Sequence, residues 1–585
     1  MPINLKQYLT LPKIMKIMGI SSGHDAGVAI IEDGKIIVAV NEERLNRKKL
    51  YSGVPILSIK ECLRLACLNP KDIDLVAFSN IGSSGGFKFQ KNYRAGKLTF
   101  MKILVDFFSY FRLMDKKFFK SICLKILSIF RNEDEIIRFL RSININAPFQ
   151  YIEHHSCHAA NAYYASHYDL NDKVLIVTTD GSGDGLCATI STVDKNGFII
   201  RKNETTTFHS PASSFYSNIT YNLGFKPLRH EGKITGLAAY GNPEKTLPIF
   251  RKYLTVDINK LEYRSNLGCY GRPAAKKLNR LLKKYSREDI AAGLQKRVEE
   301  VASALIYYAA KKYDCNKVCL SGGLFANVRL NQAIMELDNI KDIYIHPHMG
   351  DGGVAAGAAL FLWAKNQKSV FPHKLDNVYL GPSFKNQEIE DELKRSGLTY
   401  KYFDNIELKI AEYLKDGKVV ARFDGRMEYG PRALCNRSIL YQATDPTIND
   451  WLNKRLHRTE FMPFAPVVLF DKASEYFKNF NSKYSFTSEF MTVTYDATDK
   501  CKKLAPAVVH VDGTARPQTV KKEVNPSIYN VISEYEKLTG SAIIINTSFN
   551  MHEEPIVCTP SDAIRSFQDG NLDVLVIGNY VVCNK

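Results

Sequence analysis

The sequence predicts an α/β protein with more than one domain. Two stretches, 317–328 and 343–360, each show a short apolar strand, a glycine-rich turn and the start of a helix. This order is typical of open α/β sheets, which bind ligands at the carboxyl ends of their strands. The chain has 585 residues, more than a single hydrophobic core usually holds. A polar segment, 366–374, interrupts the pattern, so we expect a domain boundary near residue 370.

The chain begins with a predicted strand and hairpin. Residues 14–20 are apolar, and residues 28–40 predict a hairpin across Asp33-Gly34. The turn at 21–27 consists of small and polar residues. A strand, a polar glycine turn and a second strand also open the actin-like ATPase folds, but an ordinary hairpin has the same pattern. Both interpretations stay open at this point.

A basic, phenylalanine-rich segment follows the first predicted elements. Residues 54–68 predict an amphipathic helix and residues 73–79 a strand. In 85–145, Lys and Arg outnumber Asp and Glu, and apolar residues recur at helical spacing. The amphipathic helices predicted there could lie on a membrane surface or hold a large acceptor. They could equally pack onto their own domain with the charges in solvent.

The composition restricts the class of protein. The formal net charge of +18 suits a polyanionic partner such as RNA, an acidic membrane surface or a phosphorylated ligand. No apolar run is long enough for a transmembrane helix, and residues 1–16 lack the features of a secretory signal. The 12 cysteines show no paired CxxC spacing, which favours reduced thiols in the cytoplasm.

Two histidines and two aspartates form a candidate metal site. His154 and His158 are four residues apart in a predicted helix, so both imidazoles lie on one face. Further ligands are available from Asp180, after the strand 173–179, and from Asp351, each beside glycines. The alternative is that the histidines are ordinary polar residues at a helix start. The four residues together favour a metal ion.

A glycine pair in the same part of the chain predicts anion binding. The strand 317–320 runs into Ser321-Gly322-Gly323 and then a helix. Backbone N–H groups at a helix N-terminus bind anions, so we predict that Gly322, Gly323 and Asn327 bind a nucleotide.

The C-terminal part concentrates arginines in loops rich in glycine and proline. A guanidinium binds phosphate and carboxylate groups in a bidentate manner, so these loops indicate an anionic substrate. A polar turn after the strand 542–546 adds further hydrogen-bonding groups. The predicted anion-binding residues are Arg426, Arg432, Arg458, Arg516, Ser548 and Asn550.

Together these motifs resemble the O-carbamoyltransferase family, which includes the nodulation protein NodU and the tobramycin and cephem carbamoyltransferases. The resemblance covers nearly the whole chain, and its most specific motif is 425–434. Its other parts are Gly23-His24-Asp25-Ala26, the His154/His158 pair, the Asp180 and Asp351 loops and residues 546–550.

The resemblance implies two domains. Residues 14–370 would form an actin/sugar-kinase/chaperone-like (ASKHA) domain with 85–145 as an insert, and residues 371–585 a YrdC-like domain. The second domain would join carbamoyl phosphate and ATP, with Mg²⁺, into carbamoyl adenylate. The first, with Fe²⁺ or another divalent metal, would pass the carbamoyl group to a hydroxyl of a small-molecule or saccharide acceptor.

The resemblance also implies roles for single residues. His24 would contact the acceptor or the adenylate, and Asp25 and Asp184 are further acid–base candidates. In many relatives a Lys-x-Arg pair precedes Pro-Phe-Ala-Pro, but here Leu456 takes the lysine position. The missing charge could come from Lys454, Arg455 or His457.

The resemblance further suggests a cytoplasmic enzyme of natural-product or saccharide biosynthesis, a homodimer as one candidate state, and no nucleic-acid partner. Two alternatives stay open. One is a transferase that carbamoylates tRNA, since the same two folds serve threonylcarbamoyl-adenosine synthesis. The other is an ATP-binding switch of the actin/chaperone type, which would leave the C-terminal arginines unexplained.

Overall fold

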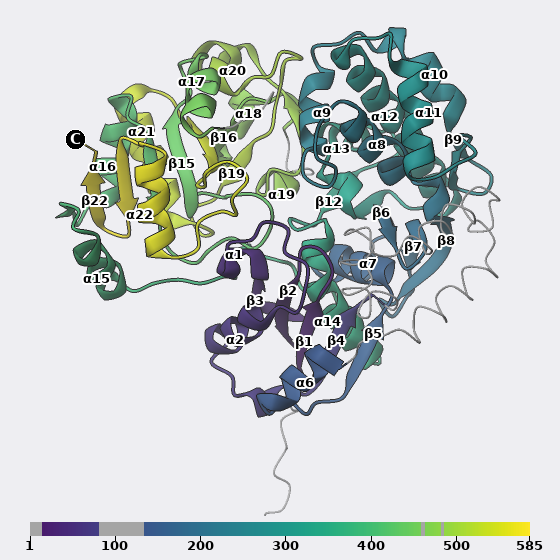
Figure 1. Ribbon diagram of the computed structural model, residues 1–585, viewed down its shortest axis with the longest axis horizontal. Helices are drawn as coiled ribbons and strands as arrows, with labels where there is room; N and C mark the ends of the chain where they lie inside the picture. The colour runs from purple at the N-terminus through teal and green to yellow at the C-terminus, as the bar shows by residue number, and fades with distance from the viewer. Residues whose placement is uncertain (1–13, 81–133, 458–461, 481–484, 585) are drawn as a thin grey trace, which may run out of the picture.

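The computed structural model describes residues 14–80, 134–457, 462–480 and 485–584 (Figure 1). Most of the predicted basic insert and all of Arg458 lie outside these ranges. We refer to the described residues up to Lys365 as the N-terminal half and to those from Asn386 onward as the C-terminal half.

The first sheet of the N-terminal half has five strands in the order β3-β2-β1-β4-β5. Neighbouring strands are antiparallel from β1 to β3 and parallel from β1 to β5. The bounds are β1 Lys16–Ser21, β2 Gly27–Glu32, β3 Lys35–Asn41, β4 Leu75–Ser79 and β5 Phe149–Ile152. The predicted strand and hairpin at the start of the chain are therefore confirmed.

The second sheet repeats this arrangement. Its order is β8-β7-β6-β11-β12, with antiparallel pairing from β6 to β8 and parallel pairing from β6 to β12. The bounds are β6 Val174–Gly183, β7 Leu186–Val193, β8 Ile199–Thr206, β11 Lys317–Ser321 and β12 Asp342–Ile345. Two sheets of the same order and orientation are the duplicated core of the ASKHA fold, so the predicted fold class is confirmed.

Two helices rich in small residues pack between these sheets. They are α7 (His154–Tyr164), which contacts β6 and β11, and α14 (Val354–Lys365), which contacts β1 and β4. A Cβ at Gly357 would lie 2.0 Å from the carbonyl oxygen of Cys157 on the other helix. The close approach of the two backbones therefore depends on glycine and alanine.

The remaining elements of the N-terminal half surround the second sheet and flank the first (Figure 1). The longest is α12, which covers the second sheet with a continuous buried side. The bounds are α1 Glu42–Asn46, α2 Ile56–Leu65, α6 Asp134–Ser142, α8 Ser217–Asn222, α9 Glu231–Ala238, α10 Leu247–Tyr253, β9 Leu254–Asp257, β10 Glu262–Ser265, α11 Arg272–Leu282, α12 Arg287–Lys312 and α13 Val328–Met335.

The C-terminal half contains a mixed sheet of eight strands in the order β13-β22-β21-β14-β15-β20-β16-β19. The strands are β13 Lys401–Tyr402, β14 Val420–Phe423, β15 Arg437–Gln442, β16 Ala465–Leu469, β19 Gln518–Val520, β20 Ile543–Ser548, β21 Val574–Ile577 and β22 Tyr580–Cys583; a small pair consists of β17 Tyr495–Asp496 and β18 Thr514–Ala515. The helices are α15 Asn386–Ser396, α16 Ile406–Lys415, α17 Ile448–Arg455, α18 Ala473–Tyr476, α19 Ser485–Ser488, α20 Asp499–Leu504, α21 Pro526–Thr539 and α22 Pro560–Asp569.

A short segment of the N-terminal half attaches directly to the C-terminal half. Arg44 of α1 donates to the carbonyl oxygen of Gly430 at 2.8 Å. Arg47 donates to the carbonyl oxygens of Pro555 and Ile556 at 2.8 and 2.7 Å. In Figure 1, α1 accordingly lies at the edge of the C-terminal half.

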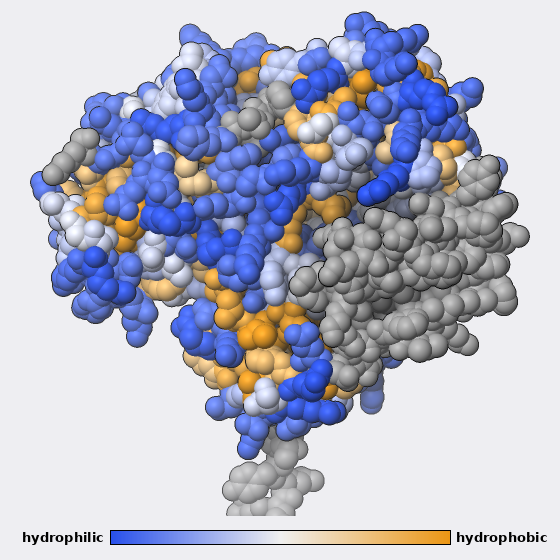
Figure 2. Space-filling view, in the orientation of Figure 1, coloured by the Kyte–Doolittle hydropathy of each residue, from blue (hydrophilic) through white to orange (hydrophobic). Residues whose placement is uncertain are grey.

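The surface is mainly polar. Figure 2 shows hydrophilic residues over most of the two halves and an apolar area over the first sheet. Among the described residues, no helix has the length and apolar character needed to cross a bilayer. The described cysteines are all free thiols. The boundary near residue 370 stays a prediction.

Candidate metal centre and anion pocket

Helix α7 brings its two histidines to the centre of the N-terminal half. Glu153 caps the helix, because its carboxylate accepts the backbone N–H groups of His155 and Ser156 at 3.2 and 2.8 Å. Arg201 of β8 binds the same carboxylate. Burial alone would raise the pKa of Glu153, but the Arg201 charge lowers it to about 2. The ion pair thus fixes the start of the helix that carries His154 and His158.

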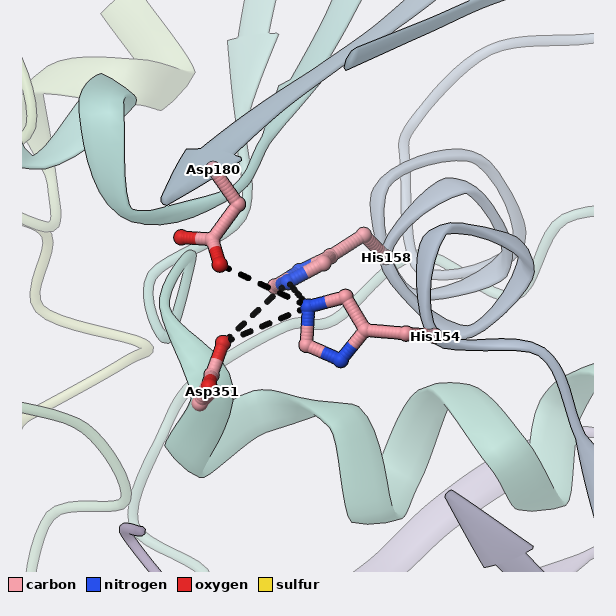
Figure 3. Close-up of side chains that lie close together, drawn as sticks. All are labelled: His154, His158, Asp180 and Asp351. Carbon is pink, nitrogen blue, oxygen red and sulfur yellow. Dashed lines mark hydrogen bonds and ion pairs between the residues drawn. The ribbon is translucent and has the colours of Figure 1, made fainter. Parts of the chain in front are cut away.

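The four predicted ligands converge (Figure 3). The Nε2 atoms of His154 and His158 lie 3.1 Å apart. Asp351 Oδ1 is 3.5 Å from each of them, and Asp180 Oδ2 is 3.5 Å from His154 Nε2. One ligand atom from each of the four residues fits within 4.8 Å of the others. The sequence prediction that these residues form one cluster is therefore met by the geometry.

Groups behind the histidines fix their orientation. The Nδ1 atom of His154 bonds Asn80 Oδ1 at 2.6 Å, and the Nδ1 atom of His158 bonds Ser321 Oγ at 3.1 Å. Both rings are buried and present Nε2 to the centre. Partners on the outer ring nitrogen are typical of histidines that bind a metal.

The centre suits a divalent metal ion. Asp351 Oδ1 is buried without a hydrogen-bond partner among the described residues. Burial and Asp351 would raise the pKa of Asp180, but His154 lowers it to about 2. Burial would lower the pKa of His154, yet Asp351 and Asp180 raise it to about 9. Two imidazoles and two carboxylates match Fe²⁺, Zn²⁺ and related ions, so the donor set fits the expected cofactor without selecting one metal.

The three candidate acid–base residues occupy different positions around this centre. His24 Nε2 lies 3.0 Å from Asp351 Oδ2, so His24 borders the centre. Asp25 follows at a positive φ of 59°, with its carboxylate 3.6 Å from His24 Nδ1. Asp184 accepts the backbone N–H of His154 at 2.9 Å and thereby also holds the helix start.

The predicted nucleotide-binding glycines lie next to the same centre. Gly323 N–H donates to Asp180 Oδ1 at 2.8 Å. Gly322 has a φ of +108°, and a Cβ there would lie 2.2 Å from the carbonyl oxygen of Thr179. Asn327 does not point to a free site, because its side chain caps α13 and bonds Gln295 and Tyr216. In this structure Asn327 therefore stabilises the start of α13 and its contact with α12.

A second site lies between the two halves. It is a cavity of about 320 Å³, which we call the anion pocket. Arg432, Arg516, Ser548 and Asn550 all line it, as predicted for a common site. Cationic and histidine side chains of both halves contribute to its wall. These are Lys49, Arg229, His230 and Lys233 from the N-terminal half and Arg432, Arg516 and His552 from the C-terminal half.

Arg426 does not line the anion pocket. Its guanidinium donates to the carbonyl oxygens of Leu380 and Gly381 at 2.7 and 3.2 Å. It lines a separate hollow beside β3 and Tyr379. The expectation that Arg426 shares a site with Arg432 is therefore not met, because the loop turns between the two residues.

The residues near Leu456 do not supply the missing lysine. Leu456 is buried in the core, and Arg455 pairs with Asp573 at 3.2 Å. Lys454, Arg455 and His457 are all absent from the pocket wall. Lys233 of α9 is present there, although it is only 4% exposed. A distant segment of the chain thus brings a lysine to the pocket.

Two family models cover most of the chain. The model described as "Carbamoyltransferase N-terminus" matches residues 16–360, and "Carbamoyltransferase C-terminus" matches residues 411–584. The chain belongs to the carbamoyltransferase family. The resemblance deduced from the motifs is therefore confirmed.

Relatives match this carbamoyltransferase over nearly its full length. Nodulation protein NolNO of Sinorhizobium fredii is 30% identical over 96% of this chain and 79% of its own length. Nodulation protein U of Rhizobium tropici is 24% identical over 97% and 95%. An uncharacterized protein of Synechocystis is 32% identical over 97% and 96%.

Solved structures resemble the carbamoyltransferase only distantly. Full-length HypF in a phosphate- and nucleotide-bound form is 14% identical and covers 60% of this chain and 47% of its own, with a TM-score of 0.33. Similarity at this level adds nothing to the topology described above.

Several residues of this carbamoyltransferase site were missed by the sequence reasoning. Asn80 and Ser321 bond the two histidines and Arg201 binds the helix cap Glu153, but each is an ordinary polar residue in the sequence. The sequence contains a weak indication that Lys233 belongs to a site, because it stands in a cluster of ionisable residues before a glycine-rich turn. The indication for Glu153 was stronger, since an acidic residue directly before a predicted helix can act as its cap.

Proposed function

We propose that this carbamoyltransferase forms carbamoyl adenylate from carbamoyl phosphate and ATP. It then transfers the carbamoyl group to a hydroxyl of a small-molecule or saccharide acceptor. The observation that supports this most directly is the anion pocket, whose wall combines cations from both halves with the polar residues Thr547, Ser548 and Asn550. A pocket of this kind suits phosphate-bearing substrates.

The first step takes place in the anion pocket. Carbamoyl phosphate loses its phosphate to water, and the resulting carbamate oxygen attacks the α-phosphorus of ATP with loss of pyrophosphate. Arg432 and Arg516 bind and orient the phosphates, and Ser548 and Asn550 supply neutral hydrogen bonds. Fixed cations at the phosphates stabilise the charge that develops on the leaving pyrophosphate.

The second step takes place at the His154/His158/Asp180/Asp351 centre. The acceptor hydroxyl attacks the carbamoyl carbon, AMP leaves, and the hydroxyl proton passes to a base. A divalent metal held by these residues supplies a positive charge for the adenylate phosphate. We place His24 beside the reacting groups, because its Nε2 already lies 3.0 Å from Asp351. Asp25 and Asp184 orient neighbouring groups in this scheme.

Mass spectrometry of acceptors tests the proposal. The purified protein is incubated with ATP, Mg²⁺, Fe²⁺, carbamoyl phosphate and a panel of aminoglycosides, chito-oligosaccharides and other hydroxyl compounds. One acceptor should gain the mass of a carbamoyl group, and pyrophosphate should appear even without acceptor. Pyrophosphate release that does not depend on carbamoyl phosphate would contradict the first step. Transfer to tRNA in place of every small acceptor would contradict the acceptor class.

A further inference from the structure

The loop between β14 and β15, which contains the most specific motif, 425–434, reaches towards both sites. Glu428 closes this loop, because its buried Oε1 accepts the backbone N–H groups of Leu434, Asn436 and Arg437 at 2.7, 2.8 and 3.1 Å. Arg432, which lines the anion pocket, lies within the closed segment. The carboxylate therefore holds the arginine in place through the backbone.

The next residue, Tyr429, connects the loop to the N-terminal half. Its hydroxyl donates to the carbonyl oxygen of Gly352 at 2.9 Å, and its side chain is buried. Its ring packs edge to face against His348, with the centroids 4.7 Å apart. Gly352 directly follows Asp351, so a side chain of the C-terminal half contacts the segment that carries a candidate metal ligand.

Gly352 is held from two sides. Its carbonyl oxygen also accepts Asn41 Nδ2 at 3.2 Å, and the Asn41 side chain binds His348 Nε2 at 2.9 Å. A Cβ at Gly352 would lie 2.2 Å from the His348 ring, so no larger residue fits without movement. Tyr429 and Asn41 together therefore fix the Gly352–Gly353 peptide, one residue beyond Asp351.

We propose that Tyr429 is a positioning residue that completes the metal centre from the other half of the molecule. By holding the Gly352 carbonyl, it sets the direction of the Asp351 carboxylate. The metal centre then reaches its full affinity only while the loop that carries Tyr429 and Arg432 is docked against the N-terminal half. This inference rests on the proposed metal centre, but it does not depend on the chemistry of the first step.

The conservative variant Tyr429→Phe removes the hydrogen bond and keeps the ring. Groups that hydrogen-bond a metal ligand directly typically account for about 10–100-fold in metal affinity or activity. Tyr429 acts through the residue after the ligand Asp351, so we expect the lower end of this range. We expect Co²⁺ to bind the folded variant about 10-fold more weakly and its visible absorption spectrum to change. Pyrophosphate release without acceptor should stay within about twofold of wild type, because Arg432 is held by Glu428.

The matched control is Tyr379→Phe. The Tyr379 hydroxyl donates to the carbonyl oxygen of Leu434 at 2.8 Å, so it binds the same loop away from the metal centre. We expect wild-type Co²⁺ affinity and spectrum in this variant. Equal losses of Co²⁺ affinity in both variants would overturn the inference, since the effect would then be general loosening of the loop.

Two further outcomes would overturn the inference that Tyr429 positions the metal centre. One is a folded Tyr429→Phe protein with unchanged Co²⁺ affinity and spectrum, and the other is a wild-type protein that binds no Co²⁺. Co²⁺ binding is measured without substrates, so failure of the proposed function is visible separately. That failure would appear as absent carbamoyl transfer in a wild-type protein that still binds the metal.

Discussion

At the residue scale, the two sites depend on different chemical groups. The metal centre uses imidazole and carboxylate atoms that approach one another to within 4.8 Å. The anion pocket uses cationic side chains, with Glu553 as the one carboxylate among its described lining residues. Substitutions should therefore separate the two steps of the proposed reaction.

His158→Ala should abolish carbamoyl transfer to acceptor and leave pyrophosphate release intact. The substitution removes one of the two imidazoles at the centre, whereas the anion pocket contains none of the four candidate ligands. Both reactions and the bound metal are measured on the same preparation. His167→Ala is the control, because His167 pairs with Asp342 outside the centre. Loss of pyrophosphate release in a folded His158→Ala protein would contradict the separation of sites.

Lys233→Met should weaken binding of the phosphate substrates. A hydrogen bond to a charged group contributes about 1.5–3 kcal/mol, so the KM for carbamoyl phosphate or ATP should rise about 10-fold or more. The KM for acceptor should not change. Lys245→Met is the control, since Lys245 is exposed and pairs with Asp289 at 2.8 Å. Unchanged KM values for both phosphate substrates would exclude Lys233 from substrate contact.

At the element scale, the metal centre depends on how helix α7 begins. The histidines occupy its first turn and the start of its second, where helices fray most readily. Glu153 caps this end and binds Arg201. The cap therefore links the stability of the helix to the geometry of the metal ligands.

Glu153→Ala should lower both stability and metal affinity. Loss of a cap typically costs about 1 kcal/mol, and loss of the partly exposed ion pair with Arg201 adds to this cost. Chemical denaturation and Co²⁺ titration measure the two effects. The control is Ser286→Ala, which removes the cap of α12 at a distance from the centre. It should reduce stability and leave Co²⁺ affinity unchanged; an equal loss of affinity would contradict a local role for Glu153.

At the scale of the whole molecule, the two halves meet around the anion pocket. Glu553 of the C-terminal half binds His230, Arg229 and Lys226 of the N-terminal half at 2.8, 2.9 and 3.0 Å. Together with the contacts of Arg44 and Arg47, this cluster holds the halves at the pocket. The wall of the anion pocket and the attachment of the halves therefore share residues.

The Glu553 cluster should make stability depend on pH. Burial alone would raise the pKa of Glu553, but bonds from His230, Lys226 and Arg229 lower it to about 2. A depressed folded-state pKa stabilises the protein above the unfolded value of about 4.5, and this contribution disappears as the pH falls towards 2. Glu553→Gln should therefore be less stable than wild type near neutral pH, by about 1 kcal/mol or less.

Urea denaturation between pH 7 and pH 3 measures this effect. The difference between wild type and Glu553→Gln should shrink as the pH falls below about 4.5. Glu390→Gln serves as the control, because among the described residues Glu390 pairs with Lys394 and Tyr400 of its own half. A difference between wild type and Glu553→Gln that is constant over this range would exclude the carboxylate charge as its source.

The sequence by itself determined the family, the four residues of the candidate metal centre and the main strands of the described sheets. Local patterns carry this information: apolar runs mark β1, β6 and β20, and the spacing of His154 and His158 places both on one helical face. Glycines beside Asp180 and Asp351 marked the loops that approach the centre. These features depend on neighbours within a few residues, so no tertiary information is needed to recognise them.

Only the tertiary structure decided which distant residues share a site. Arg426 and Arg432 line different hollows although they are only six positions apart in the sequence. Lys233, from a distant segment, lines the anion pocket, whereas the position at which many relatives have a lysine is Leu456. The tertiary structure also placed Tyr429 against Gly352, 77 positions away. These contacts arise from the packing of the two halves, and sequence spacing has no fixed relation to distance across such an interface.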